Sequence, residues 1–304
     1  MNIDKTLKNN KTELLSYFRD RASEFLTNIK QKYSETQSDK RARAINECLN
    51  ETKNKLITTV LQQAEKENWT HQEKLECLLM ITYCNIIVMI ESRNSVRLYE
   101  YMDFSRRVGE LWDPFCKLCF YYPVNDVSLF VPPLFSEVKK KLTDEIVDYI
   151  NKLNITPEEK EELRKYYDKV WSLVTSGEIQ LELDLHFVSQ GQKFVVDFKS
   201  GFGSNEKGNT NRLLLVASIY KNLSESYKCL LFVRAEENNS YFNTLKNSGI
   251  WDAYSGSEAY DKIREYSGYN LKSWIEANMD WANDFKPETI AHFQDLNLLQ
   301  YLLW

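Results

Sequence analysis

The chain has 304 residues, of which 43% are hydrophobic and 27% charged, and its formal net charge at pH 7 is −5. This composition excludes a disordered chain and is typical of a soluble globular protein that buries a substantial core. The negative charge argues against a protein that coats nucleic acid non-specifically, although a local basic groove is enough for DNA binding.

The N-terminus leads directly into charged residues without the apolar core of a signal peptide, so we expect a cytoplasmic protein with no membrane association. The six cysteines are then reduced thiols. Cys116 and Cys119 form a lone CxxC without a second cysteine or histidine pair nearby. We therefore interpret them as small buried hydrophobic side chains rather than zinc ligands.

From Asn10 to Arg107 the chain contains no glycine and no proline, and apolar residues recur at helical spacing. The first helix follows an apolar stripe from Leu14 to Ile29. A second is predicted over Asp39 to Glu67, and a third from Thr70 past Arg97. The apolar run Cys77 to Ile90 is too short to span a bilayer, which favours a helix buried in a bundle.

Four of the six prolines fall between Pro114 and Pro133, and this density predicts that no continuous helix crosses the segment. We interpret it as a junction between a helical region, residues 1–135, and a catalytic core with C-terminal helices, residues 136–304. The helical region would serve DNA recognition or dimerisation. An irregular loop inside a single domain is the equal alternative.

A helix is then predicted from Thr156 to Ser176, with Thr156 as its cap and Pro157 in its first turn. Gly177 ends this helix. Its apolar residues are spaced to form one buried stripe, namely Leu163, Tyr166, Tyr167, Val170, Leu173 and Val174.

A short polar segment that contains Gly191 lies between two runs in which side chains of different character alternate, Ile179 to Phe187 and Phe194 to Lys199. Together they predict a β-hairpin. If Ser189 pairs with Gln192, Asp184 lies opposite Asp197, and Glu182 lies opposite Lys199. Facing side chains are about 5 Å apart, and two carboxylates at that distance repel each other. A divalent cation such as Mg²⁺ would relieve the repulsion, whereas a solvated polar face is the simpler alternative.

Asp184, followed by Asp197-Phe198-Lys199, resembles the D…(D/E)-x-K signature of the PD-(D/E)xK nuclease superfamily, which includes type II restriction endonucleases. Leu183 stands where the family often has proline. The resemblance implies that Asp184, Asp197 and the Phe198 carbonyl hold Mg²⁺, and that Lys199 acts on the attacking water. It also implies a further acid upstream, for which the candidates are Glu162 and Glu178, while Glu182 shares the site face.

The segment after Lys199 is rich in glycine and polar residues, which suits either a loop that orders against a phosphodiester backbone or a plain connection. Its candidate DNA contacts are Ser200, Ser204, Asn205, Lys207, Asn209, Asn211 and Arg212. A helix from Asn211 to Leu223 and a strand from Cys229 to Val233 are predicted next, followed by helices over 241–247, 257–266, 271–284 and 287–303.

These elements predict an α+β fold with a mixed sheet flanked by helices. The resemblance implies the core order α-β-β-β-α-β, in which one strand stays unplaced, either after Lys199 or before Leu181. The leading hypothesis is a Mg²⁺-dependent, site-specific endonuclease that acts on double-stranded DNA as a homodimer. The alternatives are a nuclease of the same superfamily in repair, recombination or RNA processing, and a non-catalytic helical interaction protein.

Overall fold

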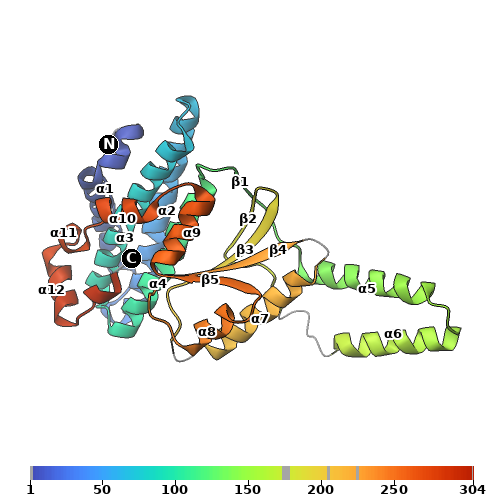
Figure 1. Ribbon diagram of the computed structural model, residues 1–304. Coiled ribbons are helices and arrows are strands. Elements are labelled where there is room, and N and C mark those ends of the chain that lie inside the picture. Colours follow the sequence, from blue (N-terminus) through green and yellow to red (C-terminus); the bar gives the residue numbers. More distant parts are fainter. Residues whose placement is uncertain (1–2, 173–178, 204–205, 224–225, 303) are drawn as a thin grey trace.

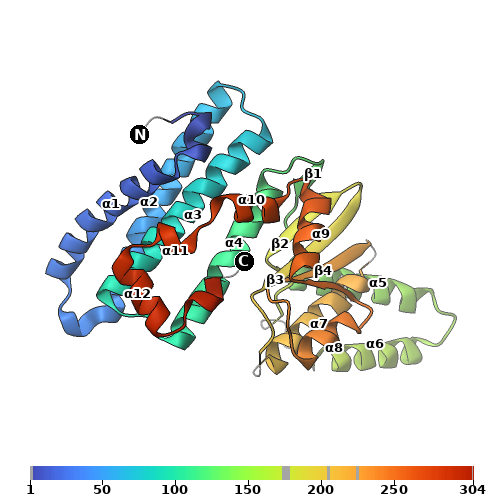
Figure 2. The ribbon, with the colours of Figure 1, turned by 60° about the vertical axis from the view of Figure 1, so that its left-hand side comes forward.

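The protein is an α+β molecule in which helices predominate around one mixed β-sheet (Figure 1), as the sequence predicts. The computed structural model describes residues 3–172, 179–203, 206–223, 226–302 and 304. Figures 1 and 2 show three parts: a bundle of the N-terminal helices, the sheet with its covering helices, and a two-helix arm that projects from the sheet away from the bundle.

The bundle is organised around a long apolar helix, α3, which packs against both α1 and α2. Its apolar run from Cys77 to Ile90 is wholly buried, as predicted. Among the described residues, α3 alone is long and apolar enough to cross a membrane, but almost all of that stretch is covered by the protein, as in the core helix of a soluble protein. The elements here are η1 Lys5–Asn9, α1 Lys11–Lys32, η2 Glu35–Gln37, α2 Ser38–Lys66 and α3 His71–Val96.

Helix α4 (Tyr101–Tyr121) runs through Pro114, so the predicted break at this proline is wrong. Proline removes one backbone hydrogen bond and crowds the carbonyl of the preceding turn, at a cost of about 3 kcal/mol. The buried face of α4 continues on both sides of Pro114, and burying each large apolar side chain contributes about 1.5–3 kcal/mol. Together these side chains outweigh the proline: Phe104, Val108, Trp112, Phe115 and Cys119.

The described residues form one five-stranded sheet in the order β1-β2-β3-β4-β5. β2 is antiparallel to both β1 and β3, whereas β3, β4 and β5 are parallel. β1 is a third strand beside the hairpin, and it lies in neither stretch where one was expected. β5 was not predicted at all. The strands are β1 Val127–Leu129, β2 Leu185–Ser189, β3 Gln192–Lys199, β4 Tyr227–Val233 and β5 Trp251–Ser255.

The sheet separates two hydrophobic cores, and β3 contributes to both. Phe194, Val196 and Phe198 pack with α4 and α9 (Ser257–Ser267) on one face. Val195 packs on the other face with α7 (Lys207–Lys221) and α8 (Ser240–Lys246). The alternation of these residues is what a strand buried on both faces requires.

The arm comprises residues 135–172, with α5 (Phe135–Lys152) and α6 (Pro157–Ser172) running antiparallel (Figure 1). α6 begins where predicted, and a reciprocal pair of hydrogen bonds between Thr156 and Glu159 caps it. From Leu163 to Val170 its apolar stripe is largely exposed, however, because α6 projects from the body of the protein and packs against α5. Tyr166 is 59% exposed and Val170 62% exposed. The last two predicted residues of the stripe, Leu173 and Val174, and the predicted end of the helix lie outside the described residues.

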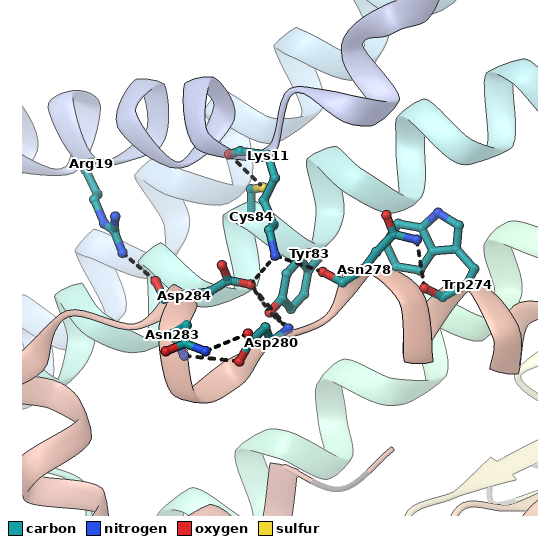
Figure 3. A network of polar contacts seen from close by, with 9 residues as sticks. All are labelled: Lys11, Arg19, Tyr83, Cys84, Trp274, Asn278, Asp280, Asn283 and Asp284. Atoms are coloured by element: carbon teal, nitrogen blue, oxygen red, sulfur yellow. Dashed lines mark hydrogen bonds and ion pairs between the residues drawn. The ribbon is translucent and has the colours of Figure 1, made fainter.

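The C-terminal segment folds back onto the bundle as α10 (Leu271–Asn278), α11 (Trp281–Asp284), α12 (Pro287–Asp295) and η4 (Leu299–Leu302). The helix predicted over 271–284 is therefore split in two, and the one from Pro287 ends early. A polar cluster around the buried side chains of Tyr83 and Asp284 joins this segment to α1 and α3 (Figure 3). We call it the Asp284 cluster, and its members are Lys11, Arg19, Tyr83, Asp280 and Asp284.

Candidate active site

The predicted hairpin forms with the predicted register. Ser189 pairs with Gln192 across a two-residue turn in which Gln190 (φ 50°) and Gly191 (φ 76°) both adopt positive φ angles. Extending this register by one pair beyond β2 places Asp184 opposite Asp197. The strand predicted from Ile179 is nevertheless wrong in its first half, since β2 begins only at residue 185.

Leu181 and Leu183 lie in the core beside α7, whereas Leu185 and Phe187 lie in the core beside α4. A regular strand would put all four on one face, because its side chains alternate with a period of two. The chain therefore crosses from one side of the sheet to the other at Asp184, which leaves this carboxylate at the open end of β2.

Asp184 caps the end of β3. Its Oδ2 accepts a hydrogen bond from the backbone N–H of Phe198 at 2.7 Å. If β2 were longer, one of its backbone carbonyls would accept this hydrogen bond instead. The N–H and C=O groups of one strand residue point to the same edge of the strand. The Phe198 carbonyl therefore faces the edge where Asp184 lies.

Asp197 and Lys199 stand two residues apart on β3 and share a face, with Lys199 Nζ 2.8 Å from Asp197 Oδ2. Arg212 reaches the same carboxylate from α7, with Nη2 3.3 Å from Asp197 Oδ1. Asn209, one turn earlier on α7, accepts from the guanidinium at 3.4 Å and helps to orient it. The Asp197 side chain is 2% exposed and that of Arg212 45%, so Arg212 links a buried acid to solvent.

Helix α4 adds a third carboxylate that the sequence analysis did not identify. Lys117 Nζ lies 2.9 Å from Asp113 Oδ1 and 4.0 Å from Asp184 Oδ1, so it connects the two acids. The Trp112 ring packs edge-on against Phe198, with centroids 5.7 Å apart. This contact holds α4 against the end of β3 and thereby brings Asp113 to the site.

Gly109, one turn before Asp113, permits this close approach. A Cβ atom at Gly109 would lie 2.7 Å from both Cβ and Oγ of Ser200, closer than real side-chain contacts allow. Ser200, a predicted DNA contact, thus packs against α4. Any larger residue at position 109 would push α4 away from the end of β3.

These groups form one cluster at the carboxyl end of β3, the edge where parallel sheets commonly bind ligands. We call it the β3 cluster, and its members are Asp113, Lys117, Asp184, Asp197, Lys199 and Arg212. Burial raises the pKa of Asp113 to about 6, and the charge of Asp184 adds to that shift. Burial also raises the pKa of Asp197, while Lys199 opposes the shift and Asp184 adds to it.

Two oxygens of the cluster, Asp113 Oδ1 and Asp197 Oδ2, are buried. Each has a lysine ammonium beside it, Lys117 Nζ at 2.9 Å and Lys199 Nζ at 2.8 Å. Buried carboxylate oxygens normally receive hydrogen bonds or a metal ion. A carboxylate oxygen has two lone pairs, so each of these oxygens can take a further positive ligand beside its lysine.

The other predicted acids are not brought to the cluster. Glu182 is exposed, and its expected partner Lys199 pairs with Asp197 instead, because the strand does not extend back to residue 182. Glu162 is exposed on α6, in the arm that projects away from the sheet. Its rival Glu178 lies outside the described residues.

His186 has a structural role in β2. It is 7% exposed, and its Nε2 accepts the Leu183 N–H at 3.3 Å. Its ring packs against Phe130 at 5.6 Å between centroids. Burial lowers the pKa of His186 to about 4, so the ring is neutral at pH 7 and suited to accepting that hydrogen bond.

The predicted DNA contacts gather at the start of α7, which begins earlier than the sequence predicts. Lys207 and Asn209 therefore lie on the helix rather than on a loop, and Asn211 lies on the helix as predicted. Lys207 and Asn211 are exposed, whereas Asn209 donates to Glu206 at 3.0 Å. Two further candidates, Ser204 and Asn205, lie outside the described residues.

The sequence does contain a signal for the acid on α4. Apolar residues continue at helical spacing on both sides of Pro114, and Asp113 and Lys117 are four residues apart, as in a helical ion pair. Only the packing of Trp112 against Phe198 shows that Asp113 and Lys117 meet the end of β3.

No protein-family model, curated protein or solved structure matches this chain.

Proposed function

We propose that the protein is a Mg²⁺-dependent endonuclease of the restriction type, which hydrolyses phosphodiester bonds of double-stranded DNA at the β3 cluster. The observation that carries this proposal is the convergence of Asp113, Asp184, Asp197 and Lys199, from separate parts of the chain, at the carboxyl end of β3, where two of the acid oxygens are buried. Perturbed carboxyl groups at the end of a strand are typical of functional sites.

The donor atoms suit Mg²⁺. Within the described parts of the chain, no three Asp, Glu, His or Cys side chains form a ready metal cage. Mg²⁺ rarely needs one, since it keeps several waters and binds through one or two carboxylates. Asp184 and Asp197 would supply these, with the Phe198 carbonyl on the same edge.

Each group of the cluster has a chemical task in this proposal. A bound Mg²⁺ makes water more acidic and screens the negative charge that develops on the phosphate. Positive charge from Mg²⁺ nearby would favour the neutral amine of Lys199, which would then orient the attacking water and accept its proton. Arg212, half-exposed and planar, would bind two phosphate oxygens. Asp113 would balance the charge of Lys117 and so leave Asp184 available.

The order of elements also supports the resemblance to PD-(D/E)xK nucleases. The core elements come in the order α-β-β-β-α-β, namely α4, β1, β2, β3, α7 and β4. Strands β3 and β4 are parallel. The arm is an insertion between β1 and β2. Asp113 on α4 takes the place in which the resemblance expects an upstream acid.

Cleavage of plasmid and phage DNA in Mg²⁺ tests the proposal. Asp184→Ala, Asp197→Ala and Lys199→Ala should each reduce cleavage by at least about 100-fold, because each removes a group that acts on the developing charge. The matched controls Glu182→Ala and Glu162→Ala should retain cleavage. Full activity in any of the first three variants would place the active site elsewhere.

The products separate this function from related ones. Discrete fragments are expected of a site-specific enzyme, whereas cleavage confined to branched, single-stranded or RNA substrates would indicate a repair, recombination or RNA nuclease with the same site.

One observation favours a non-catalytic protein instead, namely that the three acids of the β3 cluster face three cations and the charges balance. A Mg²⁺ titration followed by melting temperature distinguishes the two. A metal that binds only the folded state must raise the melting temperature, and this rise should disappear in Asp184→Asn/Asp197→Asn. No rise and no cleavage would support the non-catalytic alternative.

A further inference from the structure

The arm has an inner side where its two helices meet. Thr143 Oγ1 lies 3.3 Å from the hydroxyl of Tyr167. Trp171 packs against Phe135, with ring centroids 6.2 Å apart, and under the ammonium of Lys139 at 5.4 Å. Positions 139 and 143 of α5 therefore face positions 167 and 171 of α6.

Successive residues of an α-helix are rotated by about 100°, so the residue before each inner position points sideways out of the arm. Because α5 and α6 run in opposite directions, these sideways positions fall on the same side of the arm for both helices. They are all apolar or aromatic, and we call them the apolar face: Leu142, Ile146 and Tyr149 on α5, and Leu163, Tyr166 and Val170 on α6.

The described chain does not cover the apolar face. Tyr149 is 63% exposed, Leu163 40%, and only Leu142 is half-buried. Leu142 also lines a groove of about 620 Å³ at the base of the arm, together with Phe130 and Tyr227. Val131, another residue of that groove, is 91% exposed. A row of exposed apolar side chains of this length marks a protein interaction site.

We propose that the apolar face is the surface through which two copies of this chain pair, arm against arm, as a helical bundle. The arm has eight Lys and Arg residues and nine Asp and Glu residues, so it neither attracts a polyanion nor strongly repels a second copy. Each chain holds one β3 cluster, and cutting both strands of a duplex in a single binding event calls for two. This last argument rests on the proposed function, whereas the apolar face and the charge balance do not.

The size of the apolar face sets the strength of the pairing. Helices of this length extend about 27 Å, and two side by side are about 20 Å wide, so each arm offers about 500 Å². A pair would bury about 1,000 Å², which lies near the lower limit for a specific interface. The groove at the base of the arm would add to this area. We therefore expect a dimer that dissociates on dilution.

Light scattering and sedimentation of the full chain, without DNA or metal, test the pairing. At high concentration the mass should be twice 35.9 kDa and should fall toward 35.9 kDa on dilution. Val170→Lys places a charge in the apolar face and should give the single-chain mass at every concentration. Asp168→Lys, on the opposite side of α6, is the matched control and should behave like the unchanged protein.

A single-chain mass for the unchanged protein at all concentrations would overturn the proposal. So would a dimer that persists in Val170→Lys, or one that Asp168→Lys disrupts equally. Far-UV circular dichroism verifies that both variants fold, as expected for exposed positions. A monomer that still cuts DNA would leave the proposed function intact, and a dimer that neither cuts DNA nor binds Mg²⁺ would leave the pairing intact.

Discussion

The protein contains two buried acidic clusters whose hydrogen bonding differs. In the Asp284 cluster, Asp284 Oδ2 accepts hydrogen bonds from Lys11 Nζ at 2.8 Å and from the Tyr83 hydroxyl at 2.7 Å. In the β3 cluster, Asp197 Oδ2 is buried and has one partner among the described residues, Lys199 Nζ at 2.8 Å. The side chains are similarly inaccessible, at 9% exposure for Asp284 and 2% for Asp197.

Burial alone therefore does not identify the functional acid. Burial and the neighbouring Asp284 raise the pKa of Tyr83, which keeps its hydroxyl protonated as a donor. Asp284 Oδ2 accepts from Lys11, Tyr83 and the Asp280 backbone, and these bonds hold the C-terminal segment on the bundle (Figure 3). Asp197 Oδ2 has the Lys199 ammonium beside it, and its second lone pair is open to a further positive ligand.

The sharpest test of this difference compares Asp284→Ala with Asp197→Asn in urea denaturation. Asp284→Ala should lower the free energy of unfolding by about 3 kcal/mol, because it leaves Lys11 and Tyr83 without their shared acceptor. Asp197→Asn should change it by less than about 1 kcal/mol, because it removes a buried charge while Lys199 and Arg212 can turn to solvent. Equal losses in the two variants would mean that the β3 cluster is also structural.

A smaller effect is expected at Gly109, where α4 meets the end of β3. Gly109→Ala should destabilise the protein by about 1–3 kcal/mol, the usual cost of overpacking, because the new Cβ collides with Ser200. It should also reduce the rise in melting temperature with Mg²⁺. Gly208→Ala, which meets no atom within 4 Å, is the matched control and should be neutral or stabilising. Adding Ser200→Gly to Gly109→Ala should restore the stability, because it removes the atoms that collide with the new Cβ. If stability is not restored, the collision with Ser200 is not the cause of the loss.

The most gradual effect is a pH dependence. Because the pKa of Asp113 is raised from 3.8 to about 6, the folded protein binds a proton that the unfolded chain does not bind between these values. Stability of the metal-free protein should therefore rise as pH falls from 6 toward 4, by at most about 1.4 kcal/mol per pH unit from this group.

His186 opposes this effect, since its pKa is lowered from 6.5 to about 4 and unfolding there takes up a proton. The measurement is therefore the difference in melting temperature between the unchanged protein and Asp113→Asn over this pH range. The difference should shrink or reverse in saturating Mg²⁺, because the metal favours the ionised acids. If the difference in melting temperature does not change with pH, Asp113 does not titrate in the folded protein over this range.

The sequence predicts those parts of the site that local patterns encode. Alternation and a turn containing Gly191 are enough to define the hairpin and to set Asp184 opposite Asp197. Contacts between distant segments are not encoded in this way. Asp113 joins the site only because Trp112 packs on Phe198, and the proline that follows it suggested the end of a helix rather than its middle.

The absence of information on distant contacts also explains why the apolar side of α6 was wrongly predicted to be buried. The apolar spacing of α6 correctly predicts a helix with an apolar side, but spacing does not say what covers that side. The resemblance makes Glu162 a candidate for the upstream acid, but spacing does not tell that α6 projects away from the sheet. β1 escaped prediction because it is only three residues long and largely exposed.

Helix α4 has a practical consequence for dissecting this molecule. The Trp112 indole donates to the Tyr260 hydroxyl at 2.8 Å, and its ring lies on Phe198, so one side chain joins the bundle, α9 and the sheet. A fragment that starts after Tyr121 would keep the whole hairpin yet lack Asp113 and Lys117, and it would expose the aromatic face of β3 to water. The shortest piece of the chain able to carry the complete cluster therefore begins with α4, well before the first strand.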